Sequence, residues 1–253
     1  MLKKVVAIGG GDIRTRGTAP IDREIIRLSD RKHPKLLFVP TASYDAEQYW
    51  EHVLEYFGGF LKCKTDVLFL VEERPSISEI RNKILSADIV YVGGGNTLMM
   101  MRLWRRLGVD KVLKAAYNKG IVLAGISAGA ICWFDSGHSD SMSFYNPKQW
   151  KYINVTGLGL IKGLHCPHYN GRTRGIPRRK HFRDMIRKTG AVGIAIENNC
   201  AIEFIDGRFY KVLTSKSYAG AYKVYRKGSE VVSKRIPQVS QLTPLRLLTD
   251  LTS

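Results

Sequence analysis

The sequence has no apolar run that approaches the roughly 20 residues needed for a membrane-spanning helix. Its opening stretch, MLKKVVAIGGG, places only four apolar residues between the lysines and the glycines, which is too few for a secretory signal peptide. The four cysteines form no CxxC pair, and in a chain of 253 residues their spacing indicates reduced thiols, not a disulfide framework. These absences predict a cytoplasmic protein without a membrane anchor.

Acidic residues are scarce relative to basic ones. The chain carries 22 Asp and Glu against 40 Lys and Arg, a formal net charge of +18. Such a surface attracts anions, whether acidic substrates, nucleic acid or anionic lipid, but a merely solvated basic surface accounts for the charge equally well. We do not expect nucleic acid as the partner, because no RNA-binding motif with interleaved aromatic residues is present.

Short, continuously apolar segments recur through the first half of the chain, at residues 5–8, 36–39, 67–71, 89–92 and 121–124. This pattern is typical of strands buried on both faces of a parallel sheet. Segments of helical length lie between them; one opens with Ser76 and Glu79 in capping-box spacing, and another breaks near Gly108. The alternation predicts an α/β fold, with a doubly wound, mostly parallel sheet flanked by helices over residues 1–135.

The second half shows a different pattern. Residues 136–160 are polar and aromatic, which predicts a loop, and 178–188 predict a helix. Apolar segments at 193–197, 201–213 and 221–228 predict antiparallel strands added to the same domain at its C-terminal end, with a hairpin at Asp206-Gly207. We interpret residues 1–253 as a single α/β domain and assign nothing to the patternless tail 237–253.

A serine lies between two glycines in VLAGISAGAICWF, residues 122–134, where an apolar strand ends. A serine nucleophile must be exposed at a tight turn, close to a base and to N–H donors. The pattern Gly-x-Ser-x-Gly between a strand and a helix allows that turn, because the glycines let the chain bend sharply against the sheet. Ser127 is therefore a candidate nucleophile. A purely structural turn that happens to contain a serine would give the same sequence pattern.

A second glycine cluster, Gly93 to Gly95, also follows a buried strand and precedes a helix. Its backbone N–H groups could complete an oxyanion hole with that of Ala128. The rival interpretation is a phosphate cradle, but neither GGG stretch has the spacing G-x-G-x-x-G or the GK[ST] of a P-loop. We therefore expect no nucleotide, no other cofactor and no metal.

A serine nucleophile needs a base and a group that orients the base. His165 and His168 lie in a turn after a predicted strand, and the residues alone do not choose between them and His138. The candidate orienting carboxylates are Glu197, after the segment GIAI, and Asp140 in a loop. The order Ser, His, Glu differs from the order Ser, acid, His of the α/β-hydrolases.

Seven short motifs, in order and spread over some 190 residues, resemble the peptidase E and cyanophycinase family of serine peptidases. That family shares its fold with class I glutamine amidotransferases. The matching segments are VAIGGGDI near the start, FVPTAS at 38–43, VGGGNT at 92–97, GISAGA at 125–130, GLGL at 157–160, PHY at 167–169 and GIAIE at 193–197.

The resemblance implies roles for particular residues. Ser127 occupies the position of the family's nucleophile, His168 that of the base, and Glu197 that of the acid in one branch, with Asp140 as the alternative acid. A strand end is a more rigid place for an orienting group than a loop, so we prefer Glu197. The implied oxyanion donors are Gly94, Gly95 and Ala128.

Peptidase E cleaves dipeptides with an N-terminal aspartate, so the resemblance implies a small acidic peptide as substrate. The chain departs from it after His168, where residues 172–188 hold eight Lys and Arg against one acid. Arg172 and Arg174 could pair with a substrate carboxylate, since arginine binds carboxylates bidentately, and Asn96 is a further candidate substrate contact. Residues 136–156 are long enough to form a lid, with Tyr145 and Trp150 as walls or as core.

Three alternatives remain at this point. One is a cyanophycinase-like hydrolase of aspartyl-linked peptides. Another is a catalytically inactive basic protein that binds an acidic ligand or nucleic acid. A glutamine amidotransferase-like activity is disfavoured because that chemistry places a cysteine at the elbow, where this chain has serine. The sequence does not indicate an oligomeric state. A homodimer formed through the edge where the parallel strands end is compatible with it.

Overall fold

Continuously apolar segments form the central strands of the larger of the two main sheets. The structure, a computed structural model, describes residues 1–250. Five strands run parallel: β1 (Lys4–Ile8), β2 (Lys35–Val39), β3 (Lys64–Val67), β4 (Ile89–Val92) and β5 (Val122–Ile126). Antiparallel β12 (Cys200–Ile205), β13 (Phe209–Thr214) and β16 (Thr243–Pro244) extend it beyond β1, in the order β16-β13-β12-β1-β5-β4-β2-β3.

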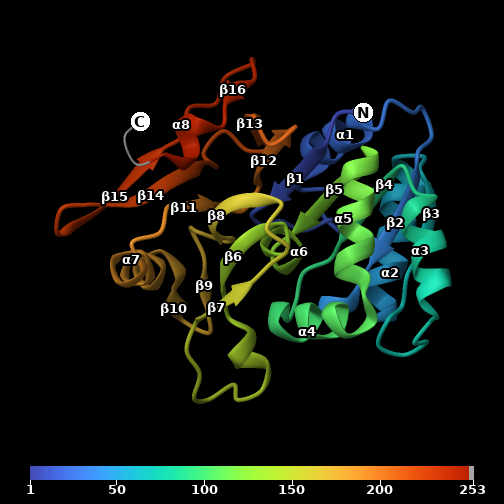
Figure 1. The fold of residues 1–253 in the computed structure, drawn as a ribbon, viewed down its shortest axis with the longest axis horizontal. Helices are drawn as coiled ribbons and strands as arrows, with labels where there is room; N and C mark the ends of the chain where they lie inside the picture. The colour runs from blue at the N-terminus through green and yellow to red at the C-terminus, as the bar shows by residue number, and fades with distance from the viewer. Residues whose placement is uncertain (251–253) are drawn as a thin grey trace.

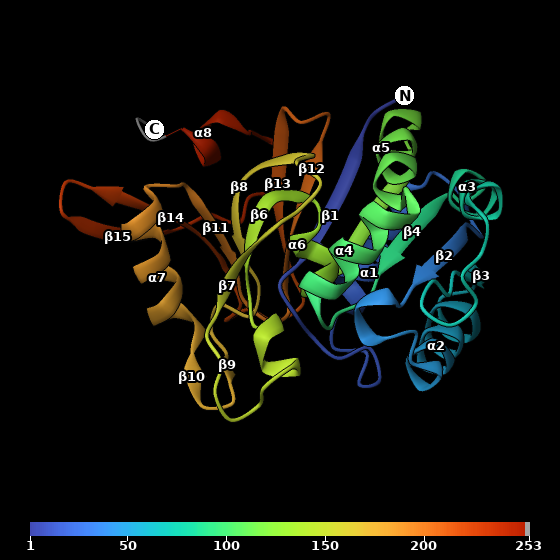
Figure 2. The ribbon, with the colours of Figure 1, turned by 60° about the horizontal axis from the view of Figure 1, so that its bottom comes forward.

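Helices cover both faces of this sheet (Figures 1 and 2). On one face lie α1 (Ala19–Leu28), α2 (Glu47–Val53) and the π-helix η2 (Leu54–Phe60), and on the other α3 (Ile77–Leu85), α4 (Thr97–Leu107) and α5 (Val109–Lys119). Successive strand residues point to opposite faces. In β2, Leu37 therefore joins the core under α3 to α5, and Phe38 joins the core under α1 and α2. The predicted α/β fold is confirmed.

Local signals for the ends of helices also agree with the structure. Ser76 and Glu79 form the predicted capping box at the start of α3. Gly108 separates α4 from α5 with φ of 75°, a left-handed conformation that favours glycine. Asp206 and Gly207, both at positive φ, form the turn of the β12–β13 hairpin. The position of one strand was predicted wrongly: β3 spans Lys64–Val67, and of the predicted residues 67–71 only Val67 belongs to it.

The second sheet has six strands and lies at the left of Figure 1. Its order is β15-β14-β11-β8-β6-β7, and α7 (Arg178–Thr189) packs against it. The strands are β6 (Phe134–Ser139), β7 (Ile153–Thr156), β8 (Ile161–Cys166), β11 (Gly193–Ile196), β14 (Ala221–Lys227) and β15 (Glu230–Arg235). Because β11 pairs in parallel with β8 and belongs to this sheet, the C-terminal strands do not all extend the first sheet in antiparallel fashion.

The prediction that residues 136–160 form a loop is wrong in part. β6 and β7 bracket the short helix η3 (Ser141–Phe144), and the irregular parts are the rest of the segment between the two strands and residues 157–160 after β7. The polar composition of the segment predicts a loop. In the structure, however, polar side chains such as His138 and Ser139 are buried in β6. In the tail, α8 (Arg246–Thr249) follows β16, and residues 251–253 lie outside the described part.

Four glycine- or proline-marked turns, which follow β1, β2, β4 and β5, meet at one edge of the larger sheet. The N–H of Ser127 donates to the carbonyl of Ile8 at 3.0 Å, and the N–H of Asn96 donates to that of Ala42 at 2.7 Å. A Cβ on Gly94 would lie 3.4 Å from the Cβ of Ser127. The carboxyl ends of β1, β2, β4 and β5 thus form one rim, where ligands of open α/β sheets bind.

The described cysteines and helices agree with the absences noted in the sequence. Cys63, Cys132, Cys166 and Cys200 are buried and free. No helix within residues 1–250 combines the length and apolarity that a membrane crossing requires.

A buried carboxyl group in α1 makes the stability depend on pH. Asp22 is fully buried, and its Oδ2 accepts hydrogen bonds from the hydroxyls of Thr18 at 2.7 Å and Tyr56 at 2.8 Å. Its Oδ1 has no partner among the described residues. Burial outweighs the two hydrogen bonds and raises the pKa of Asp22 to about 7.

We expect Asp22→Asn to remove part of the pH dependence of stability. The folded state holds the Asp22 proton up to about pH 7, whereas an unfolded aspartate loses it near pH 4. Between these values the wild-type free energy of unfolding should fall as pH rises, by up to about 4 kcal/mol from this group. Urea unfolding at pH 4.5 and 7.5 measures the difference, with the exposed Asp30→Asn as control. An equal pH slope in wild type and Asp22→Asn would contradict it.

Candidate active site

Ser127 occupies a sharp elbow between β5 and the short helix α6 (Ala128–Ile131). Its backbone has φ of 56° and ψ of −111°, which a residue with a side chain rarely adopts. The flanking glycines allow the elbow: a Cβ on Gly125 would lie 2.2 Å from the carbonyl oxygen of Gly129, and one on Gly129 2.2 Å from that of Val92. The glycines of GISAG therefore let α6 pack directly on β5 and β4, and the strained turn holds the serine at the rim.

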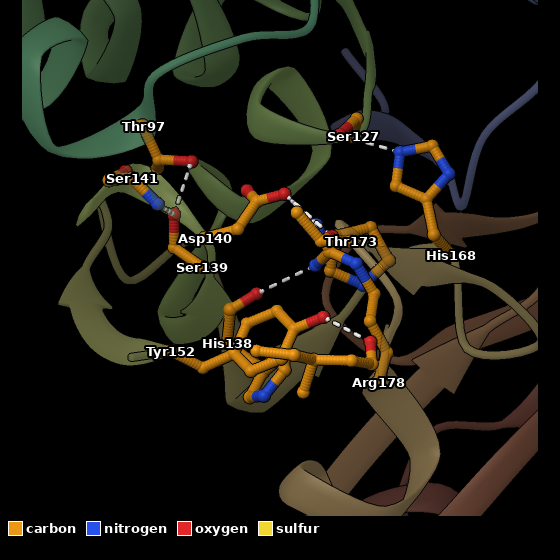
Figure 3. Close-up of polar contacts among 12 residues, drawn as sticks. Thr97, Ser127, His138, Ser139, Asp140, Ser141, Tyr152, His168, Thr173 and Arg178 are labelled. Atoms are coloured by element: carbon orange, nitrogen blue, oxygen red, sulfur yellow. Dashed lines mark hydrogen bonds and ion pairs between the residues drawn. The ribbon is translucent and has the colours of Figure 1, made fainter. Parts of the chain in front are cut away.

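His168 reaches Ser127 from the turn after β8. Its Nε2 lies 2.8 Å from the Oγ of Ser127, and Figure 3 shows the two side chains facing each other. The backbone N–H of His168 donates to the carbonyl of Gly9 at 2.9 Å, which ties this turn to the end of β1. Burial, followed by the nearby positive charge of Arg178, lowers the pKa of His168 to about 4. The imidazole is therefore neutral at neutral pH, as a proton acceptor must be.

Asn198 holds the other side of the imidazole. The Nδ1 of His168 lies 2.5 Å from the Oδ1 of Asn198. An amide oxygen can only accept, so Nδ1 carries the proton and Nε2 is left free to accept one from the serine hydroxyl. The backbone N–H of Asn198 donates in turn to the side chain of Asn170 at 3.1 Å. Ser127, His168 and Asn198 are thus connected by two successive hydrogen bonds.

Neither carboxylate expected to orient the imidazole does so. Glu197 forms an ion pair with Arg179 at 3.3 Å, and Asp140 forms one with Arg178 at 2.5 Å. Both arginines belong to the first turn of α7, so each acid is neutralised by that helix. The preference for Glu197, and the alternative Asp140, are corrected to Asn198 as the partner of His168.

Sequence reasoning missed Asn198 because it searched only for carboxylates. The residue directly follows Glu197, two positions beyond the end of β11. The segment GIAIENN does place a polar residue near the rim at both positions, but nothing in it shows which side chain turns toward the histidine. That choice depends on Arg179, which comes from a separate helix.

The first glycine cluster, Gly9 to Gly11, packs against the histidine and the asparagine. A Cβ on Gly10 would lie 2.1 Å from the Oδ1 of Asn198 and 2.3 Å from the Nδ1 of His168. The carbonyl of Gly10 accepts from the N–H of Asn199 at 2.8 Å. Only a residue without a side chain leaves room for the imidazole–amide pair, and this explains the glycine.

The backbone groups expected to form an oxyanion hole lie around Ser127. Ala128 is the first residue of α6, where a helical N–H has no intrahelical acceptor. Gly94 contacts the serine side chain, as described above. Gly95 has φ of 138°, and a Cβ there would lie 2.1 Å from the carbonyl oxygen of Ala42. Their role as donors stays a proposal.

Of the three residues expected to bind substrate, two have other contacts. Asn96 is fully buried and caps α4: its Oδ1 accepts from the N–H of Met99, and its Nδ2 donates to the hydroxyl of Tyr44. Its amide is thus used within the protein, which makes the assignment of Asn96 to substrate wrong. Arg172 is exposed and donates to the carbonyl of Gly175, in the small hairpin of β9 (Arg172–Thr173) and β10 (Ile176–Pro177). Arg174, exposed at the tip of that hairpin, stays a prediction.

The other candidate bases are core residues. His165 is fully buried, stacks on Phe134 and bonds through Nδ1 to the carbonyl of Ile194, and burial lowers its pKa to about 3. His138 stacks on Tyr152, and its Nε2 lies 3.1 Å from the Nδ1 of His181. Neither forms a hydrogen bond with Ser127 within residues 1–250, so the geometry selects His168.

Arg178 joins three segments beside the site. Besides the ion pair with Asp140, it donates to the carbonyl of His138 and lies over the ring of Tyr152 (Figure 3). Thr173 donates to the same Asp140 carboxylate at 2.9 Å. This network fixes the end of β6 and the β9–β10 hairpin to the start of α7. Trp150, expected as a wall or as core, packs edge-on against Tyr152.

A cavity of about 440 Å³ adjoins the elbow. Ile126, the residue before Ser127, forms part of its wall, with the loop after β1 and the start of α2 opposite. Asp12 and Arg14, paired with each other at 2.8 Å, lie in that loop. Within residues 1–250 no three His, Cys, Asp or Glu side chains are grouped as metal ligands would be. The rim thus offers a serine hydroxyl, a neutral imidazole and a polar cavity.

Comparisons with known proteins find peptidases. Residues 5–212 match the family described as "Peptidase family S51". The chain is 33% identical to "Uncharacterized peptidase YgaJ" of Bacillus subtilis over 238 residues, which cover 93% of this chain and 98% of that protein. It is 31% identical to "Uncharacterized peptidase Lmo0363" of Listeria monocytogenes, over 53% of this chain and 64% of that protein.

Solved structures show the same fold. A peptidase from an acI-B1 Actinobacterium superimposes with a TM-score of 0.73 at 18% identity, over 96% of this chain and 97% of that one. A putative peptidase E protein from Listeria monocytogenes gives a TM-score of 0.61 at 21% identity, over 94% and 100% of the two chains.

Proposed function

The chain belongs to peptidase family S51, and on that premise we propose that it hydrolyses short peptides with Ser127 as the nucleophile. The observation that carries the proposal is the hydrogen-bonded sequence of Ser127, His168 and Asn198, with distances of 2.8 and 2.5 Å, at a strained elbow. His168 acts as general base and general acid. Asn198 is a positioning residue, because it touches only the imidazole.

The reaction runs in two halves. The Ser127 oxygen bonds to the peptide carbonyl carbon while its proton passes to the Nε2 of His168. The resulting oxyanion faces the N–H of Ala128 and the backbone at Gly94 and Gly95. Collapse breaks the C–N bond, and the leaving amine takes the proton from Nε2. A water molecule then attacks the ester carbon and gives its proton to the same nitrogen. As the ester C–O bond breaks, Nε2 returns the proton to the Oγ of Ser127, and the acid product leaves.

The substrates that fit best are short acidic peptides, including aspartyl peptides. The net charge of +18 favours anionic substrates, and Arg14 brings a guanidinium to the cavity beside Ser127. A volume of about 440 Å³ suits a few residues and not a folded chain. A cyanophycinase-like activity on aspartyl-linked peptides ranks second, since a basic surface repels the guanidinium groups of that polymer.

Covalent labelling tests the nucleophile independently of substrate choice. A fluorophosphonate probe should attach to Ser127 in the wild-type protein, and peptide mass mapping would locate the adduct. Ser127→Ala should not be labelled, and His168→Ala should be labelled far more slowly because the base is missing. A wild-type protein that resists the probe and hydrolyses no peptide would favour an inactive binding protein instead.

We expect Asn198→Leu to lower kcat/KM by roughly 100-fold, because the imidazole loses the acceptor that fixes its tautomer and orientation. Asn198→Asp should retain activity but move the acid limb of the pH–rate profile to higher pH, since a carboxylate favours the imidazolium. Glu197→Gln is the matched control on the neighbouring residue and should stay near wild type. A larger loss in Glu197→Gln than in Asn198→Leu would return the orienting role to Glu197.

A further inference from the structure

A second pocket, of about 300 Å³, opens along α4 on the side of the loop that follows β2. Its floor is apolar and includes the buried side chains of Leu70 and Leu103. Its walls carry three arginines, Arg74, Arg102 and Arg106. We call this feature the arginine pocket. The combination of an apolar floor and convergent polar groups is that of a ligand site.

The three guanidinium groups are not balanced by acids. All three arginines are exposed, and none forms an ion pair with another residue among 1–250. Arg102 and Arg106 stand four residues apart on one face of α4, a like-charge spacing that destabilises a helix.

The acidic residues closest in the sequence do not neutralise these arginines. Glu72 and Glu73 precede Arg74 without pairing with it. Asp45 uses its Oδ2 to accept the backbone N–H groups of Leu70 and Val71 at 2.6 and 2.5 Å. The repulsion between the arginines thus has no compensation inside the protein, which points to an anionic ligand from outside.

Two exposed tyrosines stand at the same pocket. The exposed fractions are 43% for Tyr44 and 51% for Tyr145, large values for aromatic side chains. Exposed tyrosine beside arginine is the composition enriched at binding surfaces, because a rigid ring offers contact area and one polar atom. Tyr145, expected as a wall of the lid, thus lines this pocket.

The arginine pocket lies near the rim that holds Ser127. The hydroxyl of Tyr44 accepts from the Nδ2 of Asn96 at 3.0 Å, and Gly94, two residues earlier, contacts Ser127. Gly94 and Asn96 are two residues apart, which places the arginine pocket near the rim. An extended peptide covers about 3.3 Å per residue, so a substrate that engages both the serine and the arginines would need several residues.

We propose that the arginine pocket is a distal subsite that binds acidic side chains of a peptide substrate several residues away from the bond attacked by Ser127. This inference rests on the proposed function and extends it to peptides longer than dipeptides. Arginine pairs with carboxylates bidentately, and three of them suit a cluster of Asp or Glu. A nucleotide fits less well, because Arg102 and Arg106 lie on the middle and end of α4, away from the helix N-terminus that would cradle a phosphate.

Binding to Ser127→Ala separates the subsite from catalysis. The probe is a fluorescein-labelled peptide of about ten residues with three consecutive glutamates, compared with the same peptide carrying glutamines. Fluorescence anisotropy should show that the glutamate peptide binds more tightly, with an affinity that falls as salt rises. Arg74→Gln/Arg102→Gln/Arg106→Gln in the Ser127→Ala background should weaken it roughly tenfold or more and leave the glutamine peptide unaffected.

A control variant with the same loss of charge distinguishes the pocket from the overall field. Arg208→Gln/Arg226→Gln/Lys227→Gln removes three cations at the turns after β12 and β14, and Figure 1 shows the β14–β15 hairpin far from α4. This control should bind the glutamate peptide nearly as the parent does. Equal losses in both triple variants would overturn the proposal, as would competition by AMP or a short oligonucleotide stronger than competition by the unlabelled peptide.

Kinetics of the otherwise wild-type enzyme complete the test. With a cleavable peptide that carries the glutamate cluster, the pocket triple variant should raise KM and leave kcat unchanged, the signature of lost ground-state binding. With the glutamine peptide, both constants should stay as in the parent. If the wild type cleaves neither peptide while the Ser127→Ala protein binds the glutamate probe through the arginines, the proposed function fails and the pocket is an anion site only.

Discussion

Ser127→Ala should reduce kcat/KM for peptide hydrolysis by roughly 10⁴- to 10⁶-fold, the effect of removing the nucleophile from a serine–histidine pair. His168→Ala should have a loss of the same order, because an unassisted serine hydroxyl is a weak nucleophile. The double variant should be no worse than either single one, since the two groups act as a unit.

Initial rates with short aspartyl peptides measure these losses, and circular dichroism shows whether each variant is folded. Ser127 is half-buried at the rim and its side chain fills no core position, so Ser127→Ala should fold normally. Losses that multiply in the double variant, or a Ser127→Ala protein that retains its rate, would show that another group attacks the substrate.

Gly10→Ala should reduce kcat/KM by roughly 10²- to 10⁴-fold without any change to a reacting group. The added methyl would overlap both the Oδ1 of Asn198 and the Nδ1 of His168, at 2.1 and 2.3 Å. Either the 2.5 Å bond between these atoms breaks or the imidazole moves away from Ser127. Both outcomes misplace the base, and a displacement of about 1 Å can lower the rate 100-fold.

Gly59→Ala is the matched control, because a Cβ at Gly59 meets nothing within 4 Å. Thermal unfolding should show Gly10→Ala to be folded, though less stable than Gly59→Ala. Fluorophosphonate labelling gives a second readout, since a misplaced base should slow labelling of Ser127 in the folded variant. Near-normal kcat/KM and labelling in Gly10→Ala would mean that the loop moves aside and that the glycine does not protect the imidazole–amide pair.

The parts of the site that follow from local sequence could be predicted. The elbow at Ser127 depends on its two flanking glycines and on a preceding apolar strand, all within a few residues. The continuous apolar pattern of β1, β2, β4 and β5 likewise identifies strands that are buried on both faces. Local residues therefore determine both the rim and its serine.

The orienting group could not be predicted, because distant residues decide it. Glu197 and Asp140 lie near the rim, as expected, but Arg179 and Arg178 at the start of α7 neutralise them. The polar strand β6 escaped prediction for a related reason: its buried His138 is stabilised by Tyr152 and His181, which lie outside that strand. Pairings between separate elements leave no periodic pattern in the sequence.

The amide behind His168 affects how an anionic substrate would approach. With Asp140 and Glu197 each matched by a guanidinium, and asparagine in the place where a carboxylate was expected, the resting centre holds no unpaired negative charge among these groups. A negatively charged peptide would meet no like-charge barrier from them, although the imidazolium formed in mid-reaction would lack the counter-charge that an aspartate or glutamate supplies. If the substrates are acidic, as proposed, this centre would give up stabilisation of a transient cation and in return would not repel them.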